Sequence, residues 1–241
     1  MNIFMGEFLG TATLILFGNG VVAGALLRDS KAENAGWIAI TAGWAFAVMI
    51  GIIVAKACGS QPAYLNPAFA IGMAVRHSNW TDVPQALAGE FLGAILGAMV
   101  VFLHYLPHWE RTPDPLAKRA AFCTEPAVRN AAANFLSEVI GTFALTFVAG
   151  ALFSRPVSPS GIPDGVGPYL VGALVWGIGL SLGGTTGYAI NPARDLGPRI
   201  AHALLPIPGK TTSDWRYAPI PVIGPIVGGC LAGMALLFTT G

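Results

Sequence analysis

The stretch "GYAINPARDLGPR", from Gly187 to Arg199, places two arginines, an aspartate and an asparagine in an otherwise oily chain. A related stretch, "YLNPAFA", covers Tyr64 to Ala70. Asn-Pro-Ala therefore occurs once in each half of the sequence, at Asn66 and at Asn191. A polar motif that returns in this way in an apolar chain indicates an internal repeat built around the two sites.

The composition indicates a membrane protein. Hydrophobic residues make up 54% of the chain and charged residues only 10%, against about 25% charged residues in soluble domains. The net charge of +1 gives no indication of a nucleic-acid partner. The cysteines are too widely spaced for a disulfide framework or a metal site, and no cofactor is expected. The apolar N-terminal stretch is too long for a typical signal peptide and is predicted to be a retained membrane helix.

Apolar runs predict an all-α membrane protein with six transmembrane helices and two re-entrant half-helices. The six predicted spans, of which the fifth is short, are Ile3–Leu27, Trp37–Ala57, Pro84–Leu106, Ala131–Phe153, Tyr169–Leu182 and Ala218–Thr239. Two further stretches, Asn66–Val75 and Asn191–Leu205, each begin at an Asn-Pro-Ala and are too short to cross a bilayer. The longest polar connection is predicted from Pro107 to Asn130.

The two halves of the chain repeat one another. "GEFLGTATLILFG" (Gly6–Gly18) matches "SEVIGTFALTFVAG" (Ser137–Gly150), which places Glu7 opposite Glu138. Each half is predicted to cross the membrane three times, an odd number, so the second half is inverted relative to the first. Inverted repeats place their working site near the membrane midplane, between interrupted helices. The predicted organisation is one transmembrane channel domain over residues 1–241. Its two inverted repeats cover about residues 1–106 and about residues 131–241.

Glycines recur at a spacing of four residues on several predicted spans. Small residues at this spacing let helices approach closely in lipid. We therefore expect these glycines to pack helices together rather than to contact a solute. They are Gly6, Gly10, Gly89, Gly93, Gly97, Gly224 and Gly228.

Each Asn-Pro-Ala is predicted to start a helix. Asn is a favoured N-cap, and Pro67 and Pro192 stand at the first helical position, where proline is favoured. The two helix N-termini would face each other near the bilayer centre, and each carries about half a positive charge. This junction disfavours cations, protons included. The amide hydrogens of Asn66 and Asn191 can be donated to a solute oxygen, so the site suits water or a neutral hydroxylated molecule.

Arg194 lies about one helical turn beyond Asn191, and a charge at membrane depth is costly unless it faces a cavity or a partner. It can be held by backbone carbonyl groups, or it can serve as a fork of donors at a constriction. Both interpretations can hold at once. Asp195 can offset that charge or bond a nearby loop.

Three glutamates lie within predicted spans. Glu7 and Glu138 are predicted to accept hydrogen bonds from the non-helical backbone that precedes each half-helix, because this backbone otherwise lacks partners. A proton relay is the alternative role for these two carboxylates. Glu90 receives no role from the sequence.

The two Asn-Pro-Ala motifs, the opening "GEFLGT" and "GYAINPARDLGPR" resemble the aquaporin superfamily over nearly the whole chain. "NPARD", with Arg199 four residues after Asp195, is similar to the glycerol-facilitator branch, whereas the water-selective branch usually has Ser after the Arg. "GPRIAHALLPI" and "DWRYAPIPVIGPIVGG" look most like channels of lactic-acid bacteria. The resemblance implies six tilted helices and two half-helices per protomer, a pore in each protomer, and a homotetramer in the lipid bilayer.

The resemblance also implies a selectivity filter made of Arg194, Tyr188, Gly179 and an aromatic residue of the second helix. That aromatic residue is Trp44 if two extra residues are allowed before the first Asn-Pro-Ala, and Phe46 without the gap. The aromatic corner gives a carbon backbone an apolar wall, Arg194 offers donors to hydroxyl groups, and Gly179 is expected to leave room. A His at position 179 would narrow the pore toward water.

The chain departs from the family pattern in two respects. "GSQPAYLNPA" stands where the family often has "SGAHLNPA", so Tyr64 replaces a pore-lining His. The resemblance also implies a plasma-membrane protein with both termini in the cytoplasm. The inner side would then carry only Lys56, Arg76 and Arg155 of the basic residues, whereas the positive-inside rule favours the opposite orientation.

The sequence thus predicts a passive channel for glycerol, water and other small uncharged solutes. A channel for undissociated lactic acid is the alternative within this class. The rival class is an ion-coupled secondary transporter, which also uses inverted repeats and broken helices but needs a coupling-ion site, and the spans offer few acids beyond Glu7, Glu90 and Glu138. An intramembrane enzyme has no support, because no His or Cys pairs with a nucleophile or metal set near the Asn-Pro-Ala junction.

Overall fold

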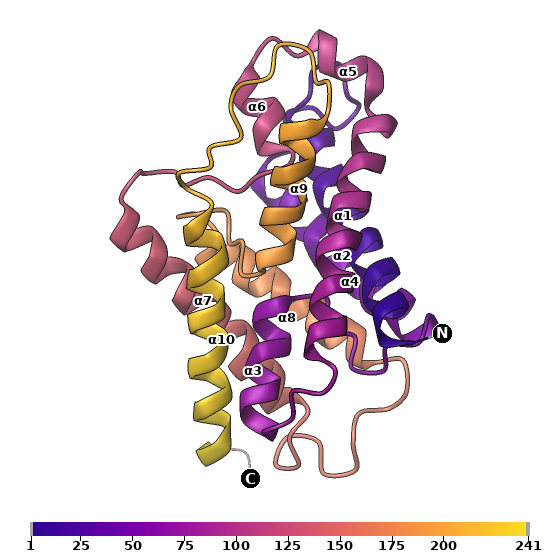
Figure 1. The fold of residues 1–241 in the computed structure, drawn as a ribbon, viewed down its shortest axis with the longest axis vertical. Coiled ribbons are helices and arrows are strands. Elements are labelled where there is room, and N and C mark those ends of the chain that lie inside the picture. The colour runs from indigo at the N-terminus through magenta and orange to yellow at the C-terminus, as the bar shows by residue number, and fades with distance from the viewer. Residues whose placement is uncertain (1, 240–241) are drawn as a thin grey trace.

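The chain folds into a bundle of helices, and the computed structural model describes residues 2–239. The long helices are α1 (Ile3–Leu26), α2 (Gly36–Ala57), α4 (Val83–His104), α7 (Ala131–Leu152), α8 (Gly167–Leu182) and α10 (Pro219–Thr239). Two half-helices, α3 (Pro67–His77) and α9 (Pro192–Leu204), are packed among them (Figure 1). No strand occurs in this described part of the chain, so the predicted all-helical fold is confirmed.

Among the described residues, five helices are long and apolar enough to cross a membrane, namely α1, α2, α4, α7 and α10. The remaining long helix, α8, has 16 residues and extends about 24 Å at the usual rise per residue. This is shorter than the roughly 30 Å hydrocarbon core of a bilayer. The helix begins at Gly167, two residues before the predicted start, because Pro168 fits its first turn.

Glycines let the long helices pack backbone against backbone, which confirms their predicted role. A Cβ atom added to Gly93 of α4 would lie 2.2 Å from the carbonyl oxygen of Phe8 in α1. A Cβ atom added to Gly228 of α10 would lie 2.4 Å from the carbonyl oxygen of Val139 in α7. No side chain fits at such distances. The first and second halves of the chain therefore use the same kind of close packing, α4 on α1 and α10 on α7.

The half-helices α3 and α9 run in opposite directions from the middle of the molecule (Figure 1). Each has an asparagine as its N-cap, Asn66 and Asn191, and a proline at its first position, Pro67 and Pro192. The predicted helix starts are therefore confirmed. The loops that precede the two half-helices meet where the helix N-termini approach each other.

The predicted polar connection from Pro107 to Asn130 is wrong in part, because it contains α5 (Leu106–Arg111) and α6 (Pro115–Ala120). Trp109 and Phe122 are fully buried in this region, with ring centroids 5.5 Å apart. Their burial gives the segment a core of its own. A local signal was available, since Asp114 caps α6 by accepting from the N–H of Leu116, directly before a proline.

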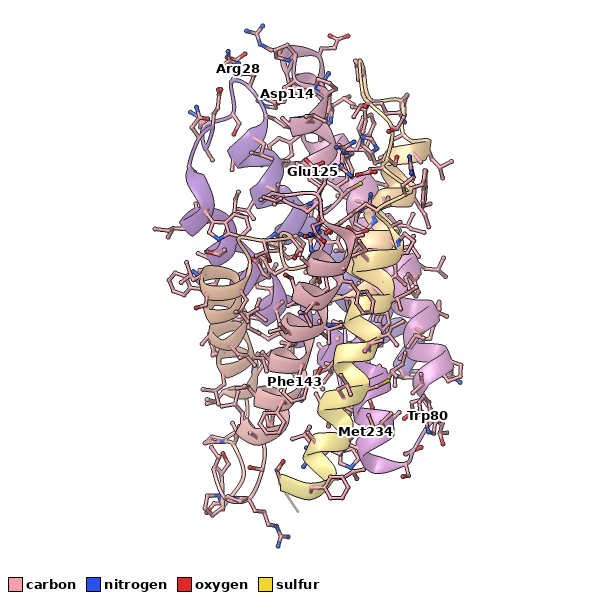
Figure 2. All side chains as sticks on the ribbon, turned by 90° about the vertical axis from the view of Figure 1, so that its left-hand side faces the viewer. Arg28, Trp80, Asp114, Glu125, Phe143 and Met234 are labelled. Atoms are coloured by element: carbon pink, nitrogen blue, oxygen red, sulfur yellow. The ribbon has the colours of Figure 1, made fainter. Side chains whose placement is uncertain are left out.

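The two ends of the molecule differ in character. Figure 2 shows Arg28 and Asp114 at the end that carries α5, which we call the α5 end, and Trp80 toward the opposite end. Phe143 and Met234 are labelled in the same half of the molecule as Trp80 (Figure 2). Apolar side chains are exposed on the flanks of the long helices, for example Leu136 and Ile140 of α7, as is expected for surfaces that face lipid or a neighbouring subunit.

Candidate functional site

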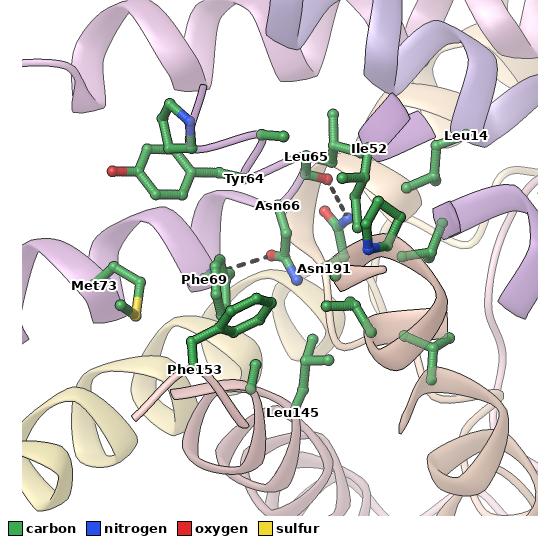
Figure 3. Close-up of a pocket in the computed structure, with 18 of the residues that line it drawn as sticks. Leu14, Ile52, Tyr64, Leu65, Asn66, Phe69, Met73, Leu145, Phe153 and Asn191 are labelled. Carbon is green, nitrogen blue, oxygen red and sulfur yellow. Dashed lines mark hydrogen bonds between the residues drawn. The ribbon is translucent and has the colours of Figure 1, made fainter. Parts of the chain in front are cut away.

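A cavity of about 720 Å³ runs through the bundle where the two half-helices meet (Figure 3). Its wall includes the predicted pore residues Trp44, Tyr64, Asn66, Tyr188, Asn191 and Arg194. Gly179 is not part of this wall. The cavity continues past Tyr64 to Lys56 and Asp164. The loop between α7 and α8, which contains Asp164, lies at the end opposite α5 (Figure 1). The structure thus brings together residues from both halves of the chain along one path.

The side-chain oxygens of the two asparagines are occupied by helix capping. Oδ1 of Asn66 accepts from the backbone N–H of Ala68 at 3.0 Å. Oδ1 of Asn191 accepts from the backbone N–H groups of Ala193 at 3.0 Å and Arg194 at 3.1 Å. Each cap orients its side-chain amide so that the NH₂ group points away from its own helix.

The two NH₂ groups link the halves of the molecule to each other. Nδ2 of Asn66 donates to the carbonyl oxygen of Ile190, and Nδ2 of Asn191 donates to that of Leu65, each at 2.7 Å. Both carbonyl residues have left-handed backbone, with φ of 54° at Leu65 and 43° at Ile190. An amide carries two hydrogens, so one hydrogen of each asparagine remains for a solute. Sequence reasoning anticipated the donors but not these links, since nothing local places the carbonyls.

Glu7 holds the loop before α3. One carboxylate oxygen accepts from Ser60 Oγ at 2.5 Å and from the N–H of Tyr64 at 2.8 Å. The other accepts from the N–H of Leu65 at 2.7 Å. These N–H groups belong to the non-helical residues that precede the half-helix, so the carboxylate supplies the acceptors that this backbone requires.

Glu138 makes the corresponding contacts in the second half. Its carboxylate accepts from Thr186 Oγ1 at 2.7 Å and from the N–H groups of Ala189 and Ile190 at 3.0 and 2.8 Å. Glu7 and Glu138 are both buried. Because their oxygens are engaged with fixed donors, the geometry matches the expected structural role better than the alternative of a proton relay.

Arg194 and Trp44 form a corner of the cavity. The guanidinium carbon of Arg194 lies 3.9 Å from the centroid of the Trp44 ring, a cation–π contact. Among the described residues, the Arg194 side chain has no hydrogen-bond acceptor, so its donors remain for a solute. Phe46, the ungapped candidate for this corner, is 59% exposed on the outside of α2 and does not line the cavity.

Tyr188 fills the space beside Gly179. A Cβ atom added to Gly179 would lie 2.9 Å from Cζ of Tyr188 and 3.0 Å from its hydroxyl oxygen. The Tyr188 ring also packs edge-on against Trp37, at 5.8 Å between centroids and 79° between planes. Trp37 in turn donates from Nε1 to the Gly179 carbonyl oxygen at 3.0 Å. The expectation that Gly179 leaves room for a solute is therefore wrong, because the tyrosine occupies that room.

Asp195 bonds a loop and a second arginine rather than Arg194. Oδ2 accepts from the N–H and the hydroxyl of Thr124 at 2.8 and 2.6 Å. Arg199 donates to both carboxylate oxygens, at 2.7 and 2.9 Å, and also to the carbonyl oxygen of Ser213 at 2.5 Å. Asp195 and Arg199 are fully buried. Of the two roles considered for Asp195, the contacts match the bond to a nearby loop.

Tyr64 belongs to an apolar section of the cavity on the side of α3. Its ring lies 6.2 Å from that of Phe69, and Met73 and Phe153 line the same section (Figure 3). An apolar section therefore separates the donors of the two asparagines and Arg194 from the charged residues Lys56, Arg76 and Asp164, which also line the cavity.

Known proteins resemble this chain over nearly its full length. The model of the major intrinsic protein family matches residues 1–236. A protein of Thermotoga maritima named probable glycerol uptake facilitator protein is 53% identical, over 96% of this chain and 96% of that protein. Glycerol uptake facilitator protein 3 of Lactiplantibacillus plantarum is also 53% identical, over 97% and 94%. The D/L-lactic acid transporter of the same organism is 39% identical, over 95% and 94%.

Among solved structures, the aquaglyceroporin from Plasmodium falciparum is similar in fold. It matches with a TM-score of 0.85 and 26% sequence identity, covering 98% of this chain and 95% of that one.

Proposed function

Because the chain belongs to the major intrinsic protein family, we propose that it is a passive transmembrane channel for glycerol, water and other small uncharged solutes. Its family and its spanning helices make it a multi-pass membrane protein. The proposal is carried by one observation. The cavity presents donors from Asn66, Asn191 and Arg194 beside the rings of Trp44 and Tyr188. A polyol requires both surfaces, because its hydroxyl groups need partners and its carbon chain does not.

Glycerol passes the corner with its hydroxyl groups toward Arg194 and its carbon chain toward the rings of Trp44 and Tyr188. It then meets the remaining amide hydrogens of Asn66 and Asn191. Each hydroxyl that leaves water receives a donor from the wall, so the cost of desolvation is offset along the path. Water uses the same donors and needs less space.

Ions are excluded by charge and by the cost of desolvation. The N-termini of α3 and α9 each contribute about half a positive charge, and Arg194 adds a full charge at the corner. Together they oppose cations and protons. An anion gains from these charges but must shed its hydration shell beside apolar walls, which is costly. The pathway therefore favours neutral solutes.

We also propose that the whole chain is one channel domain with inverted repeats over about 1–106 and 131–241. The matching roles of Glu7 and Glu138, and the reciprocal bonds of the two asparagines, support this organisation. Exposed apolar side chains on the helix flanks suit a homotetramer embedded in lipid.

The proposed location is the cytoplasmic membrane, with both termini in the cytoplasm. This puts the α5 end outside, although its many basic residues favour the opposite orientation. Several of these charges are committed to protein partners, which weakens their influence as free loop charges. Lys210 donates to three carbonyl oxygens, and Arg119 pairs with Glu125. Labelling of an Arg155→Cys variant in intact cells tests the orientation. Protection from an impermeant maleimide supports a cytoplasmic site, and labelling contradicts it.

Undissociated lactic acid is the second candidate solute. A relative named D/L-lactic acid transporter is 39% identical over most of this chain, and the neutral acid presents hydroxyl groups much as glycerol does. The donors and the apolar wall that accept glycerol also suit this molecule.

An ion-coupled transporter is the rival class. A coupling ion would need free acidic ligands within the spans. The oxygens of Glu7 and Glu138 already accept from backbone and hydroxyl donors. Glu90, whose Oε2 has no partner among the described residues, does not line the cavity. Passive flux is therefore favoured by the same contacts that build the pore.

Stopped-flow light scattering on proteoliposomes tests the proposal. Vesicles with the protein should be more permeable to glycerol and to water than empty vesicles prepared in the same way. Urea and lactic acid at two pH values define the range of solutes. Glycerol permeability no higher than that of empty vesicles would overturn the proposed function.

A further inference from the structure

Glu90 on α4 touches the backbone of one Asn-Pro-Ala and not the other. Its Oε1 accepts from the backbone N–H of Asn66 at 2.9 Å. The side chain is fully buried, and its other oxygen, Oε2, has no partner among the described residues. A buried carboxyl oxygen without a partner costs free energy. The contact with Asn66 is the one hydrogen bond that this side chain makes in the described structure.

The second half of the chain has no counterpart of Glu90. Gly89 of α4 and Gly224 of α10 are equivalent, because an added Cβ would lie 3.1 Å from the Glu7 Cβ in one case and 2.9 Å from the Glu138 Cβ in the other. The residue after Gly224 is Pro225, which offers no acceptor. In the described part of the chain, the backbone N–H of Asn191 correspondingly has no acceptor.

The N–H that Glu90 holds belongs to the same peptide unit as the Leu65 carbonyl, which accepts from Nδ2 of Asn191 at 2.7 Å. Glu7 holds the N–H on the other side of Leu65. Leu65 is left-handed, with φ of 54°, a conformation that is unfavourable for residues other than glycine. Its peptide unit therefore needs support from both sides to keep its carbonyl aimed at Asn191.

We propose that Glu90 is a positioning residue that fixes the Leu65–Asn66 peptide and, through its carbonyl, the Asn191 amide. One side chain thereby orients the donors of both asparagines, and the two halves of the channel are not equivalent in this respect. Hydrogen bonds in series also polarise one another, so the acceptor on the N–H strengthens the carbonyl as an acceptor for Asn191. Because the solute donors are those asparagines, the transport consequence rests on the proposed function, whereas the backbone consequence does not.

Three variants test whether Glu90 acts as a hydrogen-bond acceptor or only fills space between helices. Glu90→Gln keeps an acceptor oxygen at this position. Glu90→Met keeps the length of the side chain but has no oxygen to accept the hydrogen bond. Pro225→Leu is the matched apolar control in the second half of the chain. In proteoliposomes, Glu90→Met should lower glycerol permeability about fivefold or more, with a smaller loss for water. Glu90→Gln should stay within about twofold of the original protein, and Pro225→Leu should keep its glycerol-to-water ratio. An unchanged ratio in Glu90→Met, or an equal loss in Glu90→Gln, would overturn the proposal.

Hydrogen exchange of the unaltered protein tests the positioning without a solute. The Asn66 backbone amide should exchange at least about tenfold more slowly than the Asn191 amide, when measured with residue-level fragmentation in mass spectrometry. Equal exchange at the two amides would overturn the proposal even if Glu90→Met fails to fold. If the Asn66 amide exchanges slowly but the protein does not transport glycerol, the positioning role is supported and the proposed solute is rejected.

Discussion

At the scale of single residues, what distinguishes a solute-binding group from a structural one is whether its donors are already engaged. Asn66, Asn191 and Arg194 keep hydrogens that face the cavity, and their remaining groups hold the pore together. Glu7 and Asp195 are as polar, but each of their carboxylate oxygens already accepts from a fixed donor of the protein. The first set is therefore the one we propose to contact solute, and the second set holds neighbouring loops in place.

Tyr188→Phe should keep glycerol permeability within about twofold of the original protein. The Tyr188 hydroxyl is buried and has no hydrogen-bond partner among the described residues, so its removal deletes no bond and leaves the ring in place. Stopped-flow measurement of glycerol and water permeability checks this expectation. A loss of more than about tenfold in glycerol alone would mean that the hydroxyl binds the solute.

Gly179→His should lower glycerol permeability far more than water permeability. The added side chain would collide with the Tyr188 ring, since even a Cβ would lie 2.9 Å from its Cζ. We expect the displaced ring to move into the cavity beside Arg194. The corner would then be narrower, and a carbon chain would be hindered more than water. The same assay compares the two fluxes, with Tyr188→Phe as the control. Equal losses of both would contradict this assignment of the filter.

At the scale of elements, α9 is held along its whole length by groups from distant loops. Asn191 caps its start, Asp195 and Arg199 tie its middle to Thr124, and Lys210 donates to carbonyl oxygens at its C-terminal end. A half-helix cannot be anchored in water at both ends as a spanning helix can. Buried polar bonds provide that anchoring here.

Arg199→Met should destabilise the protein by about 3–5 kcal/mol, because it leaves the fully buried Asp195 without its ion-pair partner. Arg28→Met is the matched control, since the Arg28–Glu33 pair is exposed and such pairs contribute about 0–1 kcal/mol. Thermal unfolding in detergent should show a much lower Tm for Arg199→Met and little change for Arg28→Met. Similar Tm values for the two variants would contradict the structural role of the buried pair.

At the scale of the whole molecule, one path joins the two halves, and its chemistry favours neutral solutes along its length. Positive potential comes from both half-helix N-termini and from Arg194. Apolar walls of Phe69, Met73 and Phe153 complete the route toward the end opposite α5.

Lactate flux should fall as pH rises above the pKa of lactic acid, following the fraction of neutral acid. The neutral molecule avoids the desolvation cost that the anion bears in a pore with apolar walls. Uptake in proteoliposomes at several pH values, with the membrane potential clamped at zero, checks this dependence. Flux that follows the anion concentration, or that carries current, would contradict a neutral-solute pathway.

Glycerol flux should be unaffected by imposed Na⁺ or proton gradients, because every carboxylate oxygen of Glu7 and Glu138 already accepts from a fixed donor, and Glu90 does not line the cavity. Vesicles with equal glycerol on both sides should accumulate none when either gradient is applied. Net accumulation against a glycerol gradient would favour the ion-coupled transporter.

Local signals in the sequence were sufficient for the long helices, for the two half-helices and for much of the family assignment, but not for α5 and α6. The starts of α3 and α9 follow from an asparagine cap and a proline at the first position, which act within one turn. The spans follow from apolar length, and the repeat from two copies of one motif. These features depend on neighbours along the chain, so they can be recognised before any tertiary contact is known.

Other features depend on partners far apart in the chain, and the folded molecule was needed to find them. Glu90 meets Asn66 across 24 positions, and Asn191 meets Leu65 across 126. The same holds for Tyr188 in the space beside Gly179 on α8. The direction of a carbonyl group at a left-handed residue cannot be predicted from the local sequence pattern. The hydrogen-bond partner of a buried polar atom depends on which groups tertiary packing places beside it. The solute donors were therefore visible in the sequence, whereas the groups that orient them became visible only when the helices were packed together.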